Sequence, residues 1–196
     1  MQAQTFMFFG IPGSGKGTQI ELLIKYLKDK NIASDVLHTS TGVEFRKVIA
    51  SGNYTGAIVK ETLEKGFLQP DFLTTSLFTN ILISGMKENT WLVADGYPRT
   101  AVQSECFEQM MRFYKRENVK IVYVKLSEEE GIKRNLLRGR KDDTKEGLAK
   151  RLEEEVNNVL PAMNYFKGKA GYEVFTINGD QSIEDVHKEI IKTLNF

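Results

Sequence analysis

The sequence predicts an α/β fold, in which a parallel β-sheet is covered by helices on both faces. Short apolar runs rich in β-branched and aromatic residues alternate with longer segments of helical periodicity. The runs lack the strict polar–apolar alternation of a half-exposed strand, so we expect them to be buried on both faces. Strands are predicted at Thr5–Phe9, Ser34–His38, Trp91–Ala94, Lys120–Leu126 and Tyr172–Ile177.

Helical segments separate these strands, and two of them begin with a capping hydroxyl followed by acidic residues, at Ser127 and Ser182. We interpret the run Glu153, Glu154 and Glu155 as a solvent-exposed helix face. Aromatic and methionine side chains such as Phe113 are assigned to the core. Helices are predicted at Gly17–Lys30, Thr100–Lys115, Ser127–Leu137, Thr144–Lys167 and Ser182–Leu194.

The segment from Ser40 to Ser84, between the second and third strands, departs from this alternation. It is too long for a simple crossover, and it contains helical patterns but no strand. We therefore interpret its first part as an inserted helical subdomain. Breaks between its helices are predicted at Gly52, Gly56, Gly66 and Pro70.

Composition restricts the class of protein. The 196 residues suffice for one domain, and 27 Lys and Arg balance 26 Asp and Glu, which argues against a protein that coats nucleic acid or an anionic membrane. Cys106 is the single cysteine, which excludes an internal disulfide and a cysteine-rich zinc site and favours a reducing compartment. No basic signal region precedes the first strand, and no apolar run reaches the roughly 20 residues of a membrane span. A cytoplasmic protein is expected.

The most specific motif is a glycine-rich loop between the first strand and the first helix. It reads Gly10-Ile11-Pro12-Gly13-Ser14-Gly15-Lys16-Gly17-Thr18. Its glycines allow backbone N–H groups to surround a phosphate, and Lys16 supplies a positive charge for β- and γ-phosphates. Gly17 takes the place of the usual hydroxyl residue, so Thr18 is the nearest candidate for that role. A phosphate-binding loop is predicted.

Asp95 ends the third apolar strand, a position from which a carboxylate can orient hydrated Mg²⁺. Gly96 follows it, so no obvious acid is placed to activate water, and the sequence contains no Asn-Lys-x-Asp guanine reader. The acceptor of the phosphoryl group is therefore predicted to be a second substrate rather than water.

Four blocks of residues give the chain a resemblance to the adenylate kinases, within the nucleoside monophosphate kinase family. The resemblance runs from Thr5 to about Ile191, and the blocks stand in the family's order and spacing. They are Gly15-Lys16-Gly17-Thr18, Ser40-Thr41-Gly42 with Arg46, Asp95-Gly96-Tyr97-Pro98-Arg99-Thr100 with Gln103, and Arg140-Lys141-Asp142-Asp143 with Arg151. All four together are far more specific than any one of them.

The resemblance implies a P-loop kinase fold, with a five-stranded parallel sheet flanked by helices, in one domain over residues 1–196. The core is expected at 1–39, 71–137 and 143–196, a helical insertion that binds the nucleoside monophosphate at 40–70, and a short lid at 138–142. Long-lid relatives carry a whole domain, sometimes with a cysteine-bound zinc, where this chain has only Gly139 between Arg138 and Arg140. No zinc is expected.

The resemblance also implies roles for the residues at matching positions. Catalytic roles fall on Lys16, Arg99, Arg134, Arg138, Arg140 and Arg151. ATP is expected to contact Gly13, Ser14, Gly15, Lys16, Gly17, Thr18, Arg134, Arg138 and Gln181. AMP is expected to contact Thr41, Arg46, Phe67, Leu68, Gln69, Gly96, Tyr97, Pro98, Arg99, Gln103, Arg140 and Arg151. Asp95 is expected to act on Mg²⁺ through water.

These roles agree with the chemistry of the side chains. Arginine binds a phosphate through two parallel hydrogen bonds, and fixed cations stabilise the charge that spreads over a transferring phosphoryl group. The Gln103 amide offers a donor and an acceptor to adenine, and it lies one helical turn beyond Arg99. Asp142 and Asp143 are interpreted as ion-pair partners of the arginines. Val43 stands where relatives usually have an acid.

The predicted function is reversible, Mg²⁺-dependent transfer of the γ-phosphoryl group of ATP to AMP, which gives two ADP. The expected partners are ATP, AMP and ADP, without nucleic acid or membrane, and a monomer is expected. Uridylate and cytidylate kinases are one alternative, but they carry an asparagine at the Gln103 position and an alanine at the Thr41 position. The other alternative is a nucleotide-binding module without turnover, suggested by the short lid and Val43.

Overall fold

The strands of the protein form a single parallel sheet. The computed structural model describes residues 2–138 and 144–196. Its strands are β1 (Thr5–Phe9), β2 (Val36–Ser40), β3 (Trp91–Asp95), β4 (Val119–Lys125) and β5 (Tyr172–Asn178). In the described part of the chain these five strands lie in the order β2-β3-β1-β4-β5, and each neighbouring pair is parallel. The predicted α/β fold with a five-stranded parallel sheet is confirmed.

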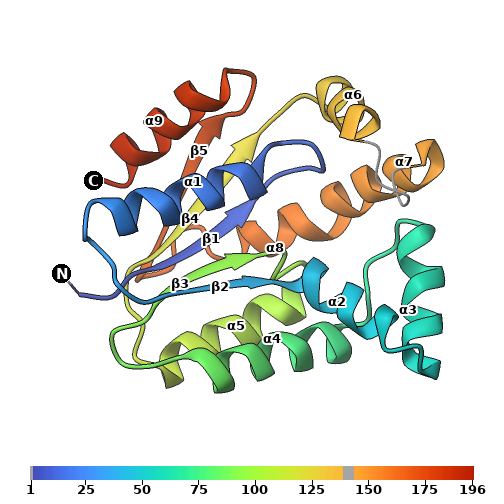
Figure 1. The fold of residues 1–196 in the computed structure, drawn as a ribbon, viewed down its shortest axis with the longest axis horizontal. Helices are drawn as coiled ribbons and strands as arrows, with labels where there is room; N and C mark the ends of the chain where they lie inside the picture. Colours follow the sequence, from blue (N-terminus) through green and yellow to red (C-terminus); the bar gives the residue numbers. More distant parts are fainter. Residues whose placement is uncertain (1, 139–143) are drawn as a thin grey trace.

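Helices connect the strands and cover both faces of the sheet. Their bounds are α1 (Lys16–Asp29), α2 (Thr41–Ala50), α3 (Tyr54–Glu64), α4 (Asp71–Gly85), α5 (Ala101–Phe113), α6 (Glu128–Arg138), α7 (Lys145–Glu154), the π-helical turn η1 (Glu155–Val159), α8 (Leu160–Asn164) and α9 (Ile183–Thr193). Helices α1 and α9 pack on one face, whereas α4, α5 and α8 pack on the other (Figure 1). None of the described helices is long and apolar enough to cross a membrane.

The core consists of two apolar clusters, one on each face of the sheet. All residues of β1 are buried, and they alternate between the clusters. Phe6 and Phe8 pack with α1 and α9, whereas Met7 and Phe9 pack with α4 and α5. Because full burial of a large apolar side chain contributes roughly 1.5–3 kcal/mol, β1 is strongly held in the centre of the protein. The glycine-rich loop therefore starts from a fixed point.

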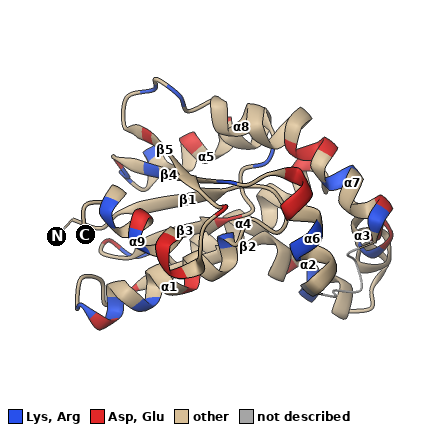
Figure 2. Cartoon of the chain, turned by 90° about the horizontal axis from the view of Figure 1, so that it is seen from above, with Lys and Arg blue, Asp and Glu red and all other residues tan. Residues whose placement is uncertain are grey.

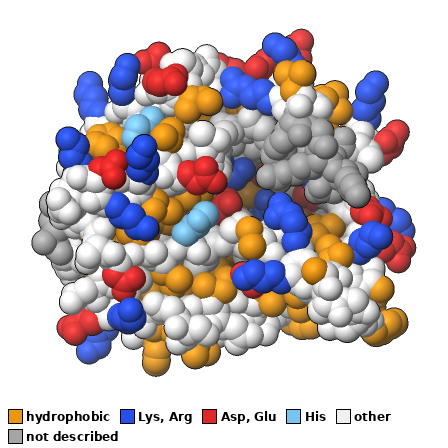
Figure 3. All heavy atoms as spheres, in the orientation of Figure 1, with side chains coloured by type: hydrophobic (Ala, Val, Ile, Leu, Met, Phe, Trp, Pro, Cys, Tyr) orange, Lys and Arg blue, Asp and Glu red, His pale blue; other side chains and the backbone are white. Residues whose placement is uncertain are grey.

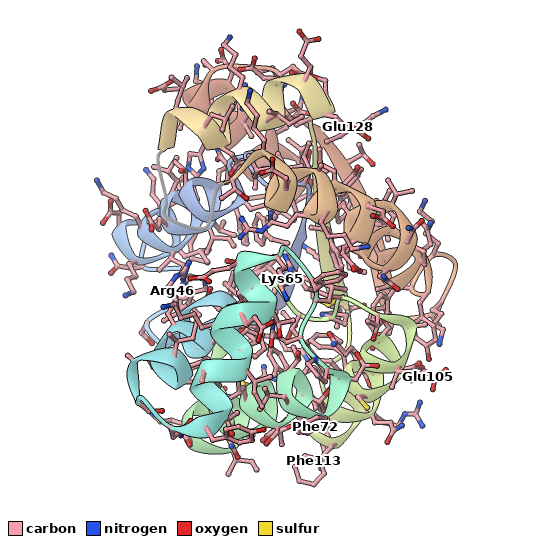
Figure 4. The ribbon with its side chains drawn as sticks, turned by 90° about the vertical axis from the view of Figure 1, so that its right-hand side faces the viewer. Arg46, Lys65, Phe72, Glu105, Phe113 and Glu128 are labelled. Carbon is pink, nitrogen blue, oxygen red and sulfur yellow. The ribbon has the colours of Figure 1, made fainter. Side chains whose placement is uncertain are left out.

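The start of the second strand and the position of Phe113 differ from the sequence predictions. The second strand begins at Val36, two residues later than predicted, because its pairing with β3 runs from Val36 opposite Trp91 to Ser40 opposite Asp95. Phe113 was expected in the core, but it is 79% exposed and points away from the protein (Figure 4). It lies two residues beyond the buried Met111 on α5, about 200° around the helix axis.

The inserted segment consists of α2 and α3, which pack against each other beside the carboxyl ends of β2 and β3 (Figure 1). The predicted breaks at Gly52, Gly66 and Pro70 fall between helices. The break predicted at Gly56 is wrong, because this residue lies inside α3. A Cβ on Gly56 would overlap the carbonyl oxygen of Val48 on α2, so the glycine serves the close packing of two helices rather than a turn.

The segment predicted as one helix over Thr144–Lys167 is divided into α7, η1 and α8. A π-helical turn contains an extra residue, so the faces of the helices on either side no longer align. Figure 2 shows the acidic residues at the junction of α7 with this turn. Glu155 begins the turn and is only 3% exposed. The interpretation of Glu155 as part of a solvent-exposed face is therefore wrong.

Candidate active site

The predicted site residues gather at the carboxyl edge of the sheet, where ligands bind in open parallel sheets of this kind. The glycine-rich loop follows β1, and Asp95 ends the neighbouring strand β3. Figure 3 shows a hollow in the molecular surface near this edge, with Lys and Arg side chains in and around it. The residues expected to bind the phosphoryl donor and the acceptor therefore share one region.

The loop has a backbone conformation that depends on its glycines. Gly10, Gly13 and Gly15 have φ angles of 144°, 83° and 87°, which residues with a side chain rarely adopt. A Cβ on Gly13 would lie 2.5 Å from the carbonyl oxygen of Gly131 and 2.7 Å from Nδ2 of Asn135, both on α6. The loop is therefore packed closely against the first turns of α6.

The polar groups of the loop suit an anionic ligand. Lys16 Nζ donates a hydrogen bond of 2.6 Å to the carbonyl oxygen of Gly10, which holds its charge over the loop. Ser14 Oγ is buried and has no hydrogen-bond partner among the described residues. Gly17 and Thr18 are exposed in the first turn of α1, whose dipole favours an anion at this end.

Two hydrogen bonds place the first helix of the insertion beside Asp95. Ser40 Oγ, at the end of β2, donates to Oδ2 of Asp95 at 3.4 Å. The buried Thr41 donates through Oγ1 to the carbonyl oxygen of Gly96 at 2.8 Å. The start of α2 is thus tied to the end of β3.

Gln103 is 1% exposed, and its side-chain amide is held from both ends. Its Oε1 accepts a hydrogen bond of 2.8 Å from the backbone N–H of Arg99. Its Nε2 donates at 2.8 Å to Oδ1 of Asp71, which also accepts from Thr100 Oγ1 at 2.8 Å. These bonds use one N–H and one lone pair of the amide, so the group keeps one donor and one acceptor in a fixed orientation.

The loop between α3 and α4 lies against α7. Gly66 has a φ of 82°, and a Cβ on it would overlap the carbonyl oxygen of Gly147 on α7. Lys150 Nζ, on the same helix, lies 4.8 Å from the ring centroid of Phe67. Gln69 is buried, and its Nε2 has no hydrogen-bond partner in the part of the chain that is described. A ligand atom that accepts a hydrogen bond would satisfy it.

Two residues expected to contact AMP have their side chains in the core. The Tyr97 ring stacks on Phe78 with 4.2 Å between centroids, and its hydroxyl lies 3.2 Å from Thr75 Oγ1. Burial raises the pKa of this hydroxyl. Pro98 is buried as well, after a cis peptide bond. Only the backbone of this pair is therefore available to a ligand, whereas Leu68 is half-buried and keeps part of its side chain accessible.

Two residues predicted for the ATP side, Arg134 and Gln181, come together at the loop after β5, which contains Gln181. Arg134, on α6, donates through Nη1 to the carbonyl oxygen of Gly179 at 3.2 Å and through Nε to Oε1 of Glu130 at 2.9 Å. The hydrogen bond from Arg134 lowers the pKa of the Glu130 carboxyl. Gln181 Nε2 donates to the carbonyl oxygen of Asn178 at 3.0 Å.

The other predicted arginines lie on three different segments. Arg46 is exposed on α2 (Figure 4), where its Nη1 donates to the carbonyl oxygen of Gly42 at 2.9 Å. Arg99 is half-buried after β3, and Arg151 is half-buried in the last turn of α7. The side chain of Arg138 and the residues Arg140, Asp142 and Asp143 lie outside the described part of the chain, so their roles stay predictions.

Sequence reasoning missed the residues that hold the predicted ones in place. Asp71 orients Gln103, Glu130 holds Arg134, and Asn135 contacts the glycine-rich loop. Asp71 opens α4 after a proline, so it resembles an ordinary acid of a first helical turn. The spacing of Glu130 and Arg134 is a recognisable i,i+4 pair. Nothing in the sequence around Asn135 signals its role.

Comparisons with known proteins show which family the chain resembles. The family model described as Adenylate kinase matches residues 8–171. The chain is 31% identical to the adenylate kinase 1 of Nostoc sp. over 188 residues, which cover 96% of this chain and 97% of the relative. It is 34% identical to the adenylate kinase of Parabacteroides distasonis over 194 residues, with 96% of each chain covered. The adenylate kinase of a Prochlorococcus marinus strain is 33% identical over 184 residues, with 94% of each covered.

Proposed function

The chain belongs to the adenylate kinase family, a family of phosphotransferases, and from this premise we propose how its residues transfer a phosphoryl group between ATP and AMP. One observation carries the proposal. The glycine-rich loop follows β1, and the segment of Arg99 and Gln103 follows the neighbouring strand β3, so both lie at the same edge of the sheet. We infer that two nucleotides bound at these segments meet at their phosphates. The sequence-based expectations of a monomer and a cytoplasmic location stay predictions.

On the donor side, the loop N–H groups and Lys16 bind the β- and γ-phosphates of ATP. The buried Ser14 hydroxyl, which lacks a partner among the described residues, is satisfied by a phosphate oxygen. Arg134 and Gln181 meet at the loop after β5 and contact the rest of the nucleotide.

On the acceptor side, the fixed amide of Gln103 reads the adenine edge, and Gln69 supplies a further donor to the base. Arg46 and Arg99 hold the phosphate of AMP, since a guanidinium group matches phosphate oxygens in pairs. Phe67 and Leu68 cover the base with apolar surface.

In the reaction, an oxygen of the AMP phosphate forms a bond to the γ-phosphorus of ATP while the bond to the β–γ bridging oxygen breaks. The AMP phosphate is already ionised, so no side chain is needed as a base. Negative charge spreads over the equatorial oxygens of the transferring group, and fixed cations in a water-poor site stabilise it. Among the described residues we assign this task to Lys16, Arg99, Arg134 and Arg151, as the sequence motifs suggest.

Mg²⁺ bound with ATP completes the proposal, and the residues at the sheet edge fit such an ion. Mg²⁺ usually keeps several waters and uses one or two carboxylates together with substrate phosphates. Asp95 supplies a half-buried carboxylate beside the loop, while Val43, 45% exposed, adds none. The described residues contain no group of three His, Cys, Asp or Glu that could hold a metal without a substrate. The bound ion supplies positive charge to the β- and γ-phosphates.

The test of the function is the rate of ADP formation from ATP with AMP, UMP or CMP as the acceptor. We expect AMP to be strongly preferred. Faster turnover with UMP or CMP would favour the uridylate and cytidylate kinase alternative. Binding of ATP without ADP formation from any acceptor would favour the module without turnover.

Replacing Asp71 by alanine is expected to raise the KM for AMP about tenfold and to leave the KM for ATP nearly unchanged. The change removes the acceptor that orients Gln103 Nε2 and Thr100 Oγ1, and a lost buried hydrogen bond costs about 1–3 kcal/mol. Asp71→Asn is the matched control, because its Oδ1 can still accept both hydrogen bonds. Equal KM values for AMP in the alanine variant and the wild type would contradict the orienting role.

Replacing Gly66 by alanine is expected to raise the KM for AMP on the order of tenfold, since small displacements of positioning groups carry large rate costs. The new Cβ would push the α3–α4 loop away from Gly147, on the helix that carries Arg151. Gly52→Ala is the matched control, because Gly52 has a φ of 68° but no atoms within 4 Å of a built Cβ. Steady-state kinetics and thermal denaturation of both variants separate the contact from backbone strain. Equal effects of the two substitutions on the KM for AMP would show that the contact does not matter.

A further inference from the structure

Glu155 is a buried carboxylate that interacts electrostatically with two of the cations that we assign to phosphate binding. Its side chain is 3% exposed, and its Oε1 has no hydrogen-bond partner among the described residues. The π-helical turn η1 begins at Glu155, and such turns are frequent at functional sites. Burial of a carboxylate oxygen without a hydrogen-bond partner is unfavourable, so packing alone does not explain this residue.

Charged and titratable groups from three other segments interact electrostatically with Glu155. Lys16, on α1, and Arg99, in the loop after β3, both attract its negative charge. Its charge in turn raises the pKa of Tyr123 on β4, in addition to the larger effect of burial. Burial raises the pKa of Glu155, and the attraction of the two cations offsets only part of this effect.

The position of Glu155 sets up a competition. Lys16 and Arg99 are the same cations that hold the donor and acceptor phosphates in the proposed function. A carboxylate beside them neutralises their repulsion in the absence of nucleotide. When phosphates bind the same cations, a charged Glu155 is a like charge at close range in a poorly hydrated site, where such repulsion is strong.

We propose that Glu155 is the counter-anion of Lys16 and Arg99 and gives up its negative charge by taking one proton from solvent when substrate phosphates bind. The inference rests on the proposed function, because it requires these two cations to bind phosphate. The proton balance is simple. A carboxylate and a proton from the buffer form a carboxylic acid, whose O–H can donate to a phosphate oxygen, and on release of the nucleotide the proton returns to solvent.

The test is calorimetric titration with two adenosines joined through a pentaphosphate, whose phosphates carry no group that titrates near neutral pH. Measurements in buffers of different ionisation enthalpy give the number of protons taken up per ligand. We expect proton uptake by the wild type and none by Glu155→Gln. At a pH where Glu155 is charged, the glutamine variant should bind the analogue about tenfold more tightly, the factor of one pKa unit of coupling.

Glu154→Gln is the matched control, since this neighbouring carboxylate accepts a hydrogen bond of 2.6 Å from Asn158 and lies 3.8 Å from Lys150 Nζ. It should take up protons like the wild type. Binding without proton uptake by the wild type, or equal uptake by Glu155→Gln, would overturn the inference while the proposed function stands. Failure of the wild type to bind the analogue would overturn the proposed function instead. If Glu155→Gln does not fold, Glu155→Asp is the second variant, because it keeps a carboxylate. We expect Glu155→Asp to take up a proton when the analogue binds, and binding without proton uptake would count against the inference.

Thermal denaturation of the ligand-free proteins gives a second readout of the same carboxylate. The folded-state pKa of Glu155 lies above the ordinary value, so its contribution favours folding at low pH and is lost as the pH rises through the folded-state pKa. Glu155→Gln should therefore have a higher Tm than the wild type near neutral pH. The difference should narrow as the pH falls toward about 4.3, the ordinary value for glutamate. If the Tm difference between Glu155→Gln and the wild type did not depend on pH, the proposal that Glu155 carries a buried negative charge near neutral pH would be contradicted.

Discussion

Replacing Lys16 by methionine is expected to slow ADP formation from ATP and AMP by about 10²–10³-fold, the usual loss on removing one preorganised charge-stabilising donor. Methionine keeps the length and apolar character of the side chain but removes the charge that Nζ holds over the loop. The fold should survive, because each of the hydrogen bonds from Nζ to the carbonyl oxygens of Gly10 and Ile11, at 2.6 and 3.4 Å, is worth about 1 kcal/mol. Coupled measurement of ADP production, with the Tm recorded alongside, checks both parts.

Lys25→Met provides the control, since Lys25 is an exposed lysine on the same helix and lies away from the loop. It should leave the rate unchanged. A fully active Lys16→Met variant would remove the role that we assign to the loop, and with it the donor half of the proposed mechanism.

Replacing Arg99 by alanine is expected to lower kcat/KM for AMP by about 10²–10³-fold. The side chain is proposed to clamp the AMP phosphate, and its loss leaves that charge without a matched partner. The backbone N–H of Arg99 still donates to Gln103 Oε1 at 2.8 Å in the variant, so recognition of adenine should persist. Arg99→Lys should recover only part of the activity, because an ammonium group cannot bind a phosphate through two parallel bonds.

Arg112→Ala is the matched control for this substitution. Arg112 is an exposed arginine on α5, 3.4 Å from Glu108, and exposed pairs of this kind contribute little to stability. Kinetics with AMP as the varied substrate should show no change. An Arg99→Ala variant with the wild-type kcat/KM for AMP would exclude Arg99 from the acceptor clamp.

The fold was predictable because local patterns and burial agree along most of the chain. Apart from Thr5 and Asp95, the residues of β1 and β3 are apolar without alternation, and they are buried on both faces of the sheet. The glycine-rich loop was predictable because its glycines, its lysine and its two flanking elements occur within a few residues of each other.

Other features depend on contacts between distant residues, which periodicity does not report. Glu155 follows two acids in a helical pattern, and the π-helical turn that buries it is visible only in three dimensions. Gly56 resembles a helix break, but α2 requires a residue without a side chain at that position. Gln103 was assigned to the acceptor pocket, whereas its partner Asp71, 32 residues earlier, was not found. The sequence motifs identified the residues that we propose contact substrate, but they did not identify the residues that position those side chains.

The close packing of Gly13 on Gly131 and Asn135 has a mechanical consequence. The helix that carries Arg134, α6, is in direct contact with the glycine-rich loop. Because Gly13 has no side chain, the backbones of the loop and of α6 lie in close contact at this point. We therefore expect a displacement of the loop on binding of the proposed phosphate to be transmitted directly to α6 and to Arg134.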